Sequence, residues 1–171
     1  DVAEEAALAE EGFMFWANAT HDYQEAAMGY PSNLNWANYQ AHNMSEPRVV
    51  SYAESHDEER LMYKNLEFGG SNGDYDASDL GTALARMEAI QCFNIPLPGP
   101  KMIWQFGELG YDYSINTCSD GVTVDPNCRV EAKPVRWDYR DDPERYRIHQ
   151  VIGGLAFLKT AHPGTFRTTD F

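Results

Sequence analysis

The chain has 171 residues, of which 43% are apolar and 23% are charged. This length fits one domain or part of a larger one, and the composition excludes collagen-like, low-complexity and wholly disordered chains. Lys and Arg total 13 against 27 Asp and Glu, which gives a net charge of −14. Nucleic acid and anionic membranes are therefore not expected as partners. The apolar runs fall short of the ~20 residues that a spanning helix needs, so we expect no membrane insertion.

The first third of the chain predicts a helix, a strand and a long irregular segment. The Ala- and Glu-rich residues 2–11 follow Asp1, a good N-cap, and predict a helix. Four bulky apolar residues at 13–16 predict a strand that is buried on both faces, as in a parallel sheet. Residues 18–46 are rich in Asn, Tyr and Gln, and we expect irregular structure there around one short helix at 22–28.

Two further apolar segments predict strands, each followed by polar residues and then by a helix. They are residues 49–53 and 102–106. The remaining helices are expected to end near Leu66, to begin after an N-cap at Asp76, and to begin at Asp142 with Pro143 in the first position. Strands that alternate with helices in this way indicate βαβ units over a parallel sheet, whose chemistry lies at the carboxyl ends of the strands.

The three cysteines are too few for a disulfide scaffold and lack the paired spacing of a zinc site. Cys92 lies in an apolar helical run and is expected to be a buried thiol. Cys118 and Cys128 flank a polar loop whose Gly, Pro and Asn residues allow its ends to meet, so we expect a disulfide. Since disulfides persist in oxidising compartments, the expected location is secreted or cell envelope.

The leading candidate site is the charged segment 54–60, ESHDEER, directly after the second predicted strand. An imidazole and a carboxylate in this position, His56 and Asp57, suit a sugar site or a metal site. On composition alone, a solvated cluster of salt bridges is the commoner outcome. Glu58 and Glu59 are interpreted as the solvated start of the next helix, where the helix dipole favours negative charge.

The motif around this segment resembles one found in a family of glycoside hydrolases. Residues 49–60 read VVSYAESHDEER and resemble the seventh-strand motif of the alpha-amylase family, in which an apolar strand ends in His-Asp followed by Arg. Residues 99–110, GPKMIWQFGELG, are similar to the eighth-strand motif of that family. Asp125 and Arg129 resemble the Asp and Arg that some members place over the glucose chain. The resemblance covers nearly all of the chain and is strongest to bacterial secreted or cell-envelope alpha-amylases.

The resemblance implies that residues 1–171 form a single partial catalytic domain of α/β class. This domain would be the C-terminal part of a TIM (β/α)8 barrel, starting after the fifth strand and holding strands six to eight. The missing N-terminal half of the barrel would then be a partner for the open edges of the sheet. The family carries its nucleophilic Asp and its acid/base Glu after strands four and five, so both are expected upstream of Asp1. The isolated chain is therefore expected to be inactive.

The implied reaction is retaining hydrolysis of internal α-1,4-glucosidic bonds in starch or glycogen, with an α-glucan as the partner. Asp57 would stabilise the transition state, and His56 would contact the same sugar. Ser55 replaces the Asn that chloride-binding members use, which argues against a chloride site. No cofactor or metal is expected in this segment, and a structural calcium would belong to the upstream part. The substrate-binding residues that the resemblance implies are His56, Asp125, Arg129, Tyr111 and Glu108.

Several alternatives remain open at this point. Glu108 could instead pair with Arg60, and Tyr111 could pack under the loop rather than stack on a sugar ring. The parent protein could be a transglycosylase or a maltodextrin-acting member of the same family. A non-catalytic glucan-binding fragment is the alternative from a different functional class, and the absence of a nucleophile and an acid from this chain favours it.

Overall fold

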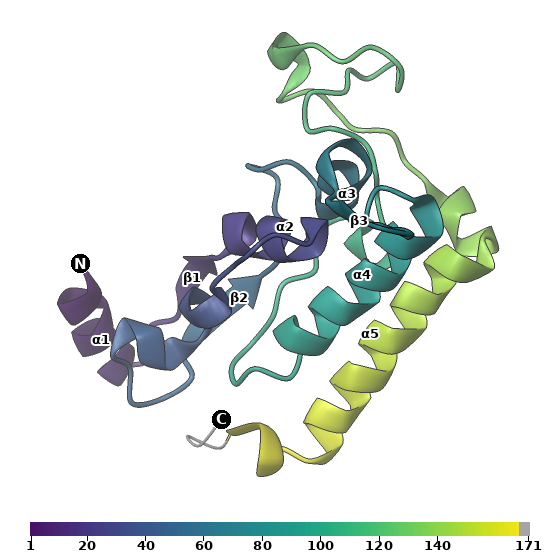
Figure 1. Cartoon of the computed structure of the whole chain (residues 1–171). Coiled ribbons are helices and arrows are strands. Elements are labelled where there is room, and N and C mark those ends of the chain that lie inside the picture. The colour runs from purple at the N-terminus through teal and green to yellow at the C-terminus, as the bar shows by residue number, and fades with distance from the viewer. Residues whose placement is uncertain (168–171) are drawn as a thin grey trace.

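Two short parallel strands form the sheet that carries the candidate site. A computed structural model describes residues 1–167 of the chain and shows helices packed beside this sheet (Figure 1). Strands β1 (Phe15–Asn18) and β2 (Val49–Tyr52) pair in parallel, with Phe15 opposite Val49. A separate antiparallel pair, β3 (Ser71–Asn72) and β4 (Tyr75–Asp76), forms a small hairpin. The fold is therefore mixed α/β with a parallel sheet.

Helices account for most of the remaining regular structure. In Figure 1 the two longest, α4 and α5, run side by side. The α-helices are α1 (Val2–Glu10), α2 (Thr20–Met28), α3 (Leu61–Phe68), α4 (Leu80–Asn94) and α5 (Pro143–Ala161). The 3₁₀ helices are η1 (Leu34–Ala37), η2 (Tyr39–His42), η3 (Gly107–Leu109), η4 (Pro126–Cys128), η5 (Trp137–Asp141) and η6 (Thr165–Arg167). No helix within residues 1–167 has the length and hydropathy needed to cross a bilayer.

Aspartate N-caps set the beginning of three helices. The Asp1 carboxylate accepts a hydrogen bond from the amide of Ala3 at 2.8 Å, and Asp142 caps α5 as predicted, with Pro143 in the first position. The predicted cap Asp76 is wrong. Asp79 caps α4, whereas Asp76 accepts from the amide of Ser78 within the preceding turn. Both aspartates accept hydrogen bonds from backbone amides, but only Asp79 directly precedes the first residue of α4.

The main core lies between α2, α3, α4 and α5. The apolar residues of α4 that recur at helical spacing, from Ala83 to Ile90, face this core. Leu80, in the first turn of the helix, is the exception because it is exposed. Cys92 is exposed rather than buried, because the helix turns Gln91 and Asn94 inward and leaves Cys92 and Phe93 on the outer face. The largest fully buried apolar side chains of this core are Tyr23, Leu61, Met62, Leu84, Met87 and Ile148.

The first predicted strand is displaced and is not buried on both faces. It begins at Phe15 rather than residue 13, and its inward residue Ala17 is fully buried. Phe13 and Trp16 remain 59% and 64% exposed. Strand β1 pairs only with β2 among the described residues, so no strand within residues 1–167 pairs with its other edge.

The prediction of a third strand at residues 102–106 is also wrong. This segment lies parallel beside β2 through a single bridge between Lys101 and Ser51. The amide of Ser51 donates to the Pro100 carbonyl at 3.3 Å. The pairing ends there because the chain turns: the Trp104 carbonyl accepts from the amide of Gly107 at 2.8 Å. The helices and the two parallel strands that do form follow one another in the predicted order.

Candidate functional site

A tight turn after β2 presents His56 and Asp57 to solvent. The hydroxyl of Ser55 accepts from the amide of Asp57 at 3.1 Å and donates to the Glu58 carboxylate. His56 Nε2 lies 3.4 Å from Asp57 Oδ2, and the two side chains are 68% and 65% exposed. The ring of Trp104 lies 5.4 Å from that of His56. An imidazole, a carboxylate and an indole therefore meet at the carboxyl end of the parallel sheet.

A buried ion pair supports this turn from below. Arg60 Nη2 donates to Glu54 at 2.8 Å, and the two side chains are 5% and 7% exposed. The second oxygen of Glu54 accepts from the amide of Leu61 at 3.0 Å, and Arg60 also donates to the carbonyl of Gln105 at 2.6 Å. A Cβ on Gly107 would lie 2.2 Å from the Glu54 carboxylate, so only glycine fits there. Both ends of the turn are thus fixed to each other and to the neighbouring segment.

The turn forms one side of a cleft of about 540 Å³. Its other sides come from residues 104–105, which follow the bridged segment, and from the long loop of residues 111–135. Charged groups of both signs and aromatic rings line this cleft, among them His56, Asp57, Trp104, Tyr113, Arg129 and Lys133. A mixed polar and aromatic lining of this kind suits a ligand that offers both hydroxyl groups and an apolar face.

Glu58 and Glu59 hold this turn to distant parts of the chain. The side-chain amide (Nδ2) of Asn18 donates to the Glu58 carboxylate at 2.5 Å, which links the turn to the end of β1. The Glu59 carboxylate accepts from the hydroxyl of Ser114 and the amide of Ile115, both at 2.7 Å. The interpretation of these glutamates as a solvated helix start is therefore wrong, since their partners lie 40 and 55–56 residues away in sequence.

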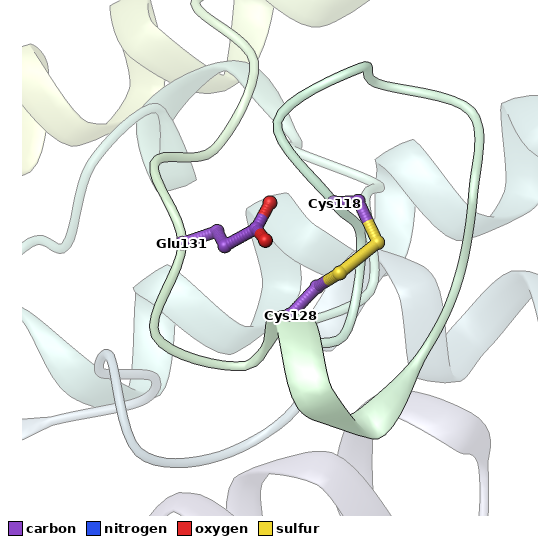
Figure 2. A group of neighbouring side chains, drawn as sticks. All are labelled: Cys118, Cys128 and Glu131. Atoms are coloured by element: carbon purple, nitrogen blue, oxygen red, sulfur yellow. A yellow bond between two sulfur atoms is a disulfide. The ribbon is translucent and has the colours of Figure 1, made fainter.

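The predicted disulfide between Cys118 and Cys128 is confirmed, and Figure 2 shows it beside Glu131. The Glu131 carboxylate accepts from the amide of Ser119 at 2.9 Å. The two sulfurs and this carboxylate lie within 4.8 Å of one another. Since both sulfurs are engaged in the disulfide, they offer no thiolate to a metal.

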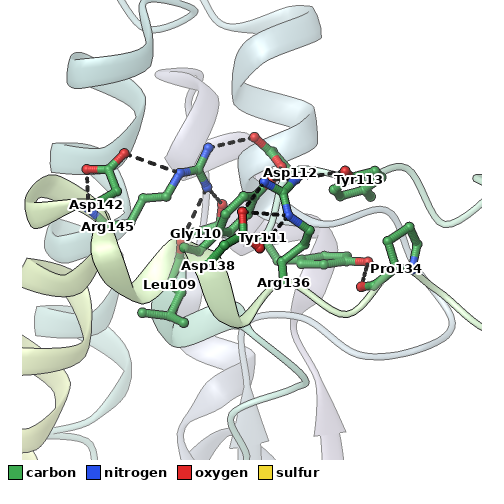
Figure 3. A network of polar contacts seen from close by, with 11 residues as sticks. Leu109, Gly110, Tyr111, Asp112, Tyr113, Pro134, Arg136, Asp138, Asp142 and Arg145 are labelled. Atoms are coloured by element: carbon green, nitrogen blue, oxygen red, sulfur yellow. Dashed lines mark hydrogen bonds and ion pairs between the residues drawn. The ribbon is translucent and has the colours of Figure 1, made fainter. Parts of the chain in front are cut away.

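Side chains from the C-terminal part of the chain fasten the beginning of the loop to α5 (Figure 3). Arg145 donates to the Gly110 carbonyl at 2.5 Å and to the Asp112 carboxylate at 2.7 Å. The hydroxyl of Tyr139 also donates to Asp112, and burial together with this bond raises the pKa of Tyr139. Arg136 donates to the hydroxyl of Tyr113 at 2.7 Å. The loop wall is thus held at its base by charge-assisted bonds.

The structure brings four of the six predicted site residues to the cleft: His56, Asp57, Arg129 and Tyr111. Arg129 donates to the backbone carbonyl of Asp57. Tyr111 takes its packing alternative, because its ring is buried under the Arg60 guanidinium at 4.7 Å and its hydroxyl donates to the Pro134 carbonyl. Burial raises the pKa of Tyr111 to about 12.

The other two predicted residues lie apart from the cleft. Glu108 borders a neighbouring hollow of about 530 Å³ beside α5. It is not the partner of Arg60, which pairs with Glu54. Asp125 accepts from the amide of Asn127 at 2.8 Å and so caps the short helix η4.

Sequence reasoning missed Trp104 and the role of Glu59. The rule that strand ends carry the chemistry would have found Trp104, because it follows the bridged segment as His56 follows β2. No local signal identifies the partners of Glu59, which lie in the distant loop.

Comparison with known proteins adds no relative from which roles could be transferred. No protein-family model matches the chain. No curated protein matches it significantly. The cleft and the motifs in residues 49–60 and 99–110 are therefore the features that bear on function.

Proposed function

We propose that this chain is part of a retaining glycoside hydrolase that cleaves internal α-1,4-glucosidic bonds of starch- or glycogen-type glucans, with Asp57 as the stabiliser of the transition state. One observation carries the proposal. His56 and Asp57 stand exposed at the mouth of the cleft while Glu54 and Arg60 hold the turn rigidly beneath them. Within residues 1–167 the Asp57 carboxylate has no side-chain partner other than His56, which leaves it available to the hydroxyl groups of a sugar.

The chemistry of the cleft supports a sugar ligand. As the glycosidic bond breaks, the ring develops positive charge, and its hydroxyl groups become better donors to an ionised carboxylate such as Asp57. His56 can exchange hydrogen bonds with a neighbouring hydroxyl. The indole of Trp104 offers an aromatic face for the apolar side of a pyranose. Of these groups, the Asp57 carboxylate is the one whose contact with the sugar strengthens at the transition state.

The same proposal assigns the fold to the C-terminal part of a (β/α)8 barrel. Strands β1 and β2 and the bridged residue Lys101 follow one another in parallel, with helices between them. The edge of β1 that has no partner within residues 1–167 is suited to pairing with a further strand, which could also cover the exposed side chains of Phe13 and Trp16. In this proposal the nucleophile and the acid/base come from an upstream part of a longer protein.

The location that fits the disulfide is outside the cytosol, secreted or in the cell envelope, because the bond between Cys118 and Cys128 is stable in oxidising compartments. Starch-type polymers that meet such a protein there would be degraded before uptake. A transglycosylase uses the same residues with a sugar in place of water, and product analysis separates the two reactions.

The proposal is tested by Asp57→Asn in the natural protein that carries residues 1–171. Turnover on starch should fall by roughly 10²–10³-fold or more, because the contact strengthens only at the transition state, while starch affinity changes little. The matched control is Asp74→Asn, in the turn of the β3–β4 hairpin away from the cleft, which should keep its turnover. Near-normal turnover of Asp57→Asn would contradict the role of this residue. Starch binding without hydrolysis by the unmodified protein would favour a glucan-binding module instead.

A further inference from the structure

The loop that forms one wall of the cleft touches the His56–Asp57 turn at two points. Arg129 Nη2 donates to the backbone carbonyl of Asp57, across 72 residues of sequence. Glu59, two residues after Asp57, accepts from Ser114 and Ile115 at the other end of the same loop. The turn is therefore held between the two ends of residues 114–129, which we call the clamp loop.

The clamp loop is rigid within itself because several cross-links join its two ends. The disulfide joins Cys118 to Cys128, and Arg129 is the next residue. Lys133 Nζ donates to the carbonyls of Thr117 and Cys128, both at 2.7 Å. The amide of Asp125 donates to the Asn116 carbonyl at 2.9 Å. The backbone of Arg129 is thus fixed relative to the end of the loop that Glu59 holds.

We propose that Arg129 is a positioning residue for Asp57 and that the Cys118–Cys128 disulfide is the constraint that lets it act. Arg129 binds the backbone carbonyl of Asp57 and does not bind its carboxylate. The contact therefore fixes the position of the Asp57 backbone without neutralising the charge of the side chain. This differs from a direct contact of Arg129 with glucose. The consequence for catalysis rests on the proposed function, whereas the restraint on the turn is a property of the ligand-free protein.

The disulfide gives the clamp loop a sensitivity to reduction. A dithiol such as dithiothreitol supplies two electrons and two protons, so that Cys118 and Cys128 become thiols while the dithiol closes to its own cyclic disulfide. The covalent restraint beside Arg129 is then lost, and hydrogen bonds alone hold the two arms of the loop together, among them those of Lys133 and that from the amide of Asp125 to the Asn116 carbonyl. The Arg129 contact is exposed and competes with water, so in this proposal freedom gained by the backbone of Arg129 weakens it.

The direct test is the solvent exchange rate of the Asp57 amide, measured by NMR in the ligand-free protein. This amide donates to Ser55 and reports opening of the turn. Arg129→Gln, and separately reduction of the disulfide, should each increase the rate roughly 3- to 10-fold, the effect of losing one net hydrogen bond. Arg129→Lys should restore most of the protection, because an ammonium also donates to a carbonyl.

Three controls separate this effect from general loosening. Cys92→Ser removes the exposed free thiol and should leave the Asp57 rate unchanged before reduction. Arg140→Gln removes an arginine of the same charge that lies beside Tyr146, away from the turn. The amide of Met87, in the buried part of α4, should keep its rate in every variant. Unchanged exchange of the Asp57 amide both after reduction and in Arg129→Gln would overturn the proposal.

A kinetic comparison then distinguishes this proposal from the proposed function. If the natural protein hydrolyses starch, Arg129→Gln should lower kcat several-fold with little change in KM, because Asp57 acts at the transition state. A rise in KM alone, with unchanged exchange of the Asp57 amide, would show instead that Arg129 binds the glucan itself. If the protein hydrolyses no glucan, the proposed function fails, and the exchange measurement still decides the role of the clamp loop.

Discussion

Two acid–base pairs occur within seven residues of one turn, and they lie in opposite environments. Glu54 and Arg60 are almost fully buried at 2.8 Å, with further bonds to Leu61 and Gln105. His56 and Asp57 are about two-thirds exposed at 3.4 Å. The buried pair is surrounded by protein donors and acceptors, whereas the exposed pair is left to solvent or to a ligand.

The difference indicates which pair stabilises the fold and which is free for chemistry. Charges taken out of water must be matched by partners, and loss of one partner leaves the other uncompensated. An exposed pair in water contributes little to stability, so its residues can be selected for function. Glu54 and Arg60 therefore hold the turn in place, and His56 and Asp57 are left available for the role we propose.

The largest expected effect comes from breaking the buried pair. Glu54→Gln, or Arg60→Met, should lower the free energy of unfolding by about 3–5 kcal/mol, because the remaining charge is buried without its partner. The matched changes in the exposed pair, His56→Gln and Asp57→Asn, should stay within about 0.5 kcal/mol. Urea unfolding of the four variants measures both. Equal losses in the two pairs would contradict the division between them.

The next largest effect tests the covalent link behind the exposed pair. Cys118→Ser combined with Cys128→Ser should lower the free energy of unfolding by about 2–3 kcal/mol, because the unfolded chain regains the freedom that the short closed loop removes. A thiol titration of the unfolded, unreduced protein should find only the thiol of Cys92. Three reactive thiols would show that the disulfide is absent.

A pair of like charges at the opposite end of the sheet extends the comparison to pH. Burial, and then the neighbouring ammonium of Lys159, lower the pKa of Lys101 to about 6. Between that value and the usual pKa near 10.5, the unfolded chain binds a proton that the folded chain does not. The unfavourable contribution of Lys101 to stability is therefore complete below pH 6 and decreases as the pH rises toward 10.5.

Lys101→Met isolates this contribution. The free energy of unfolding of the unmodified chain, relative to that of the variant, should increase by about 1 kcal/mol or more between pH 7 and pH 10. Urea unfolding of both proteins at the two pH values provides the comparison. Groups that do not interact with Lys101 cancel in the difference, so the difference reports Lys101 together with its coupled neighbour Lys159. A difference that does not change with pH would mean that Lys101 keeps its proton in the folded state.

The smallest expected effect concerns the aromatic neighbour of the exposed pair. Trp104→Ala should weaken binding of maltoheptaose by about threefold, because in the proposed site the indole beside His56 would stack on a sugar ring. The control is Trp137→Ala, which removes a well-exposed indole outside the cleft and should leave the affinity unchanged. Calorimetric titration of both variants gives the two affinities. An equal loss in the two would show that stacking is not specific to the cleft.

The sequence predicts those features that depend on neighbours in the chain. The cap at Asp142 and the disulfide loop are set within a few residues, and both are confirmed. The position of the His56–Asp57 turn at a strand end follows from the change of polarity after residue 53, and the structure places it there.

Features that depend on distant partners could not be predicted in the same way. In an apolar run such as residues 13–16 the sequence does not indicate which side chains other segments will cover. Phe13, for example, is exposed. The partners of Glu59 lie in a loop 55–56 residues away. Tyr111 could equally stack on a ligand or pack, and only the position of Arg60 over its ring decides between them.

The most direct test of the central claim is an NMR titration of the chain with maltoheptaose, an α-1,4-glucan, and with cellopentaose, its β-1,4 counterpart. If the cleft binds α-glucans, resonances of His56, Asp57 and Trp104 should shift saturably with maltoheptaose, while cellopentaose leaves them in place. Amides of α4 serve as the internal reference, because this helix does not line the cleft. Resonances of the cleft that stay unchanged at saturating maltoheptaose, or that shift equally with both sugars, would contradict the assignment of this cleft to α-1,4-glucans.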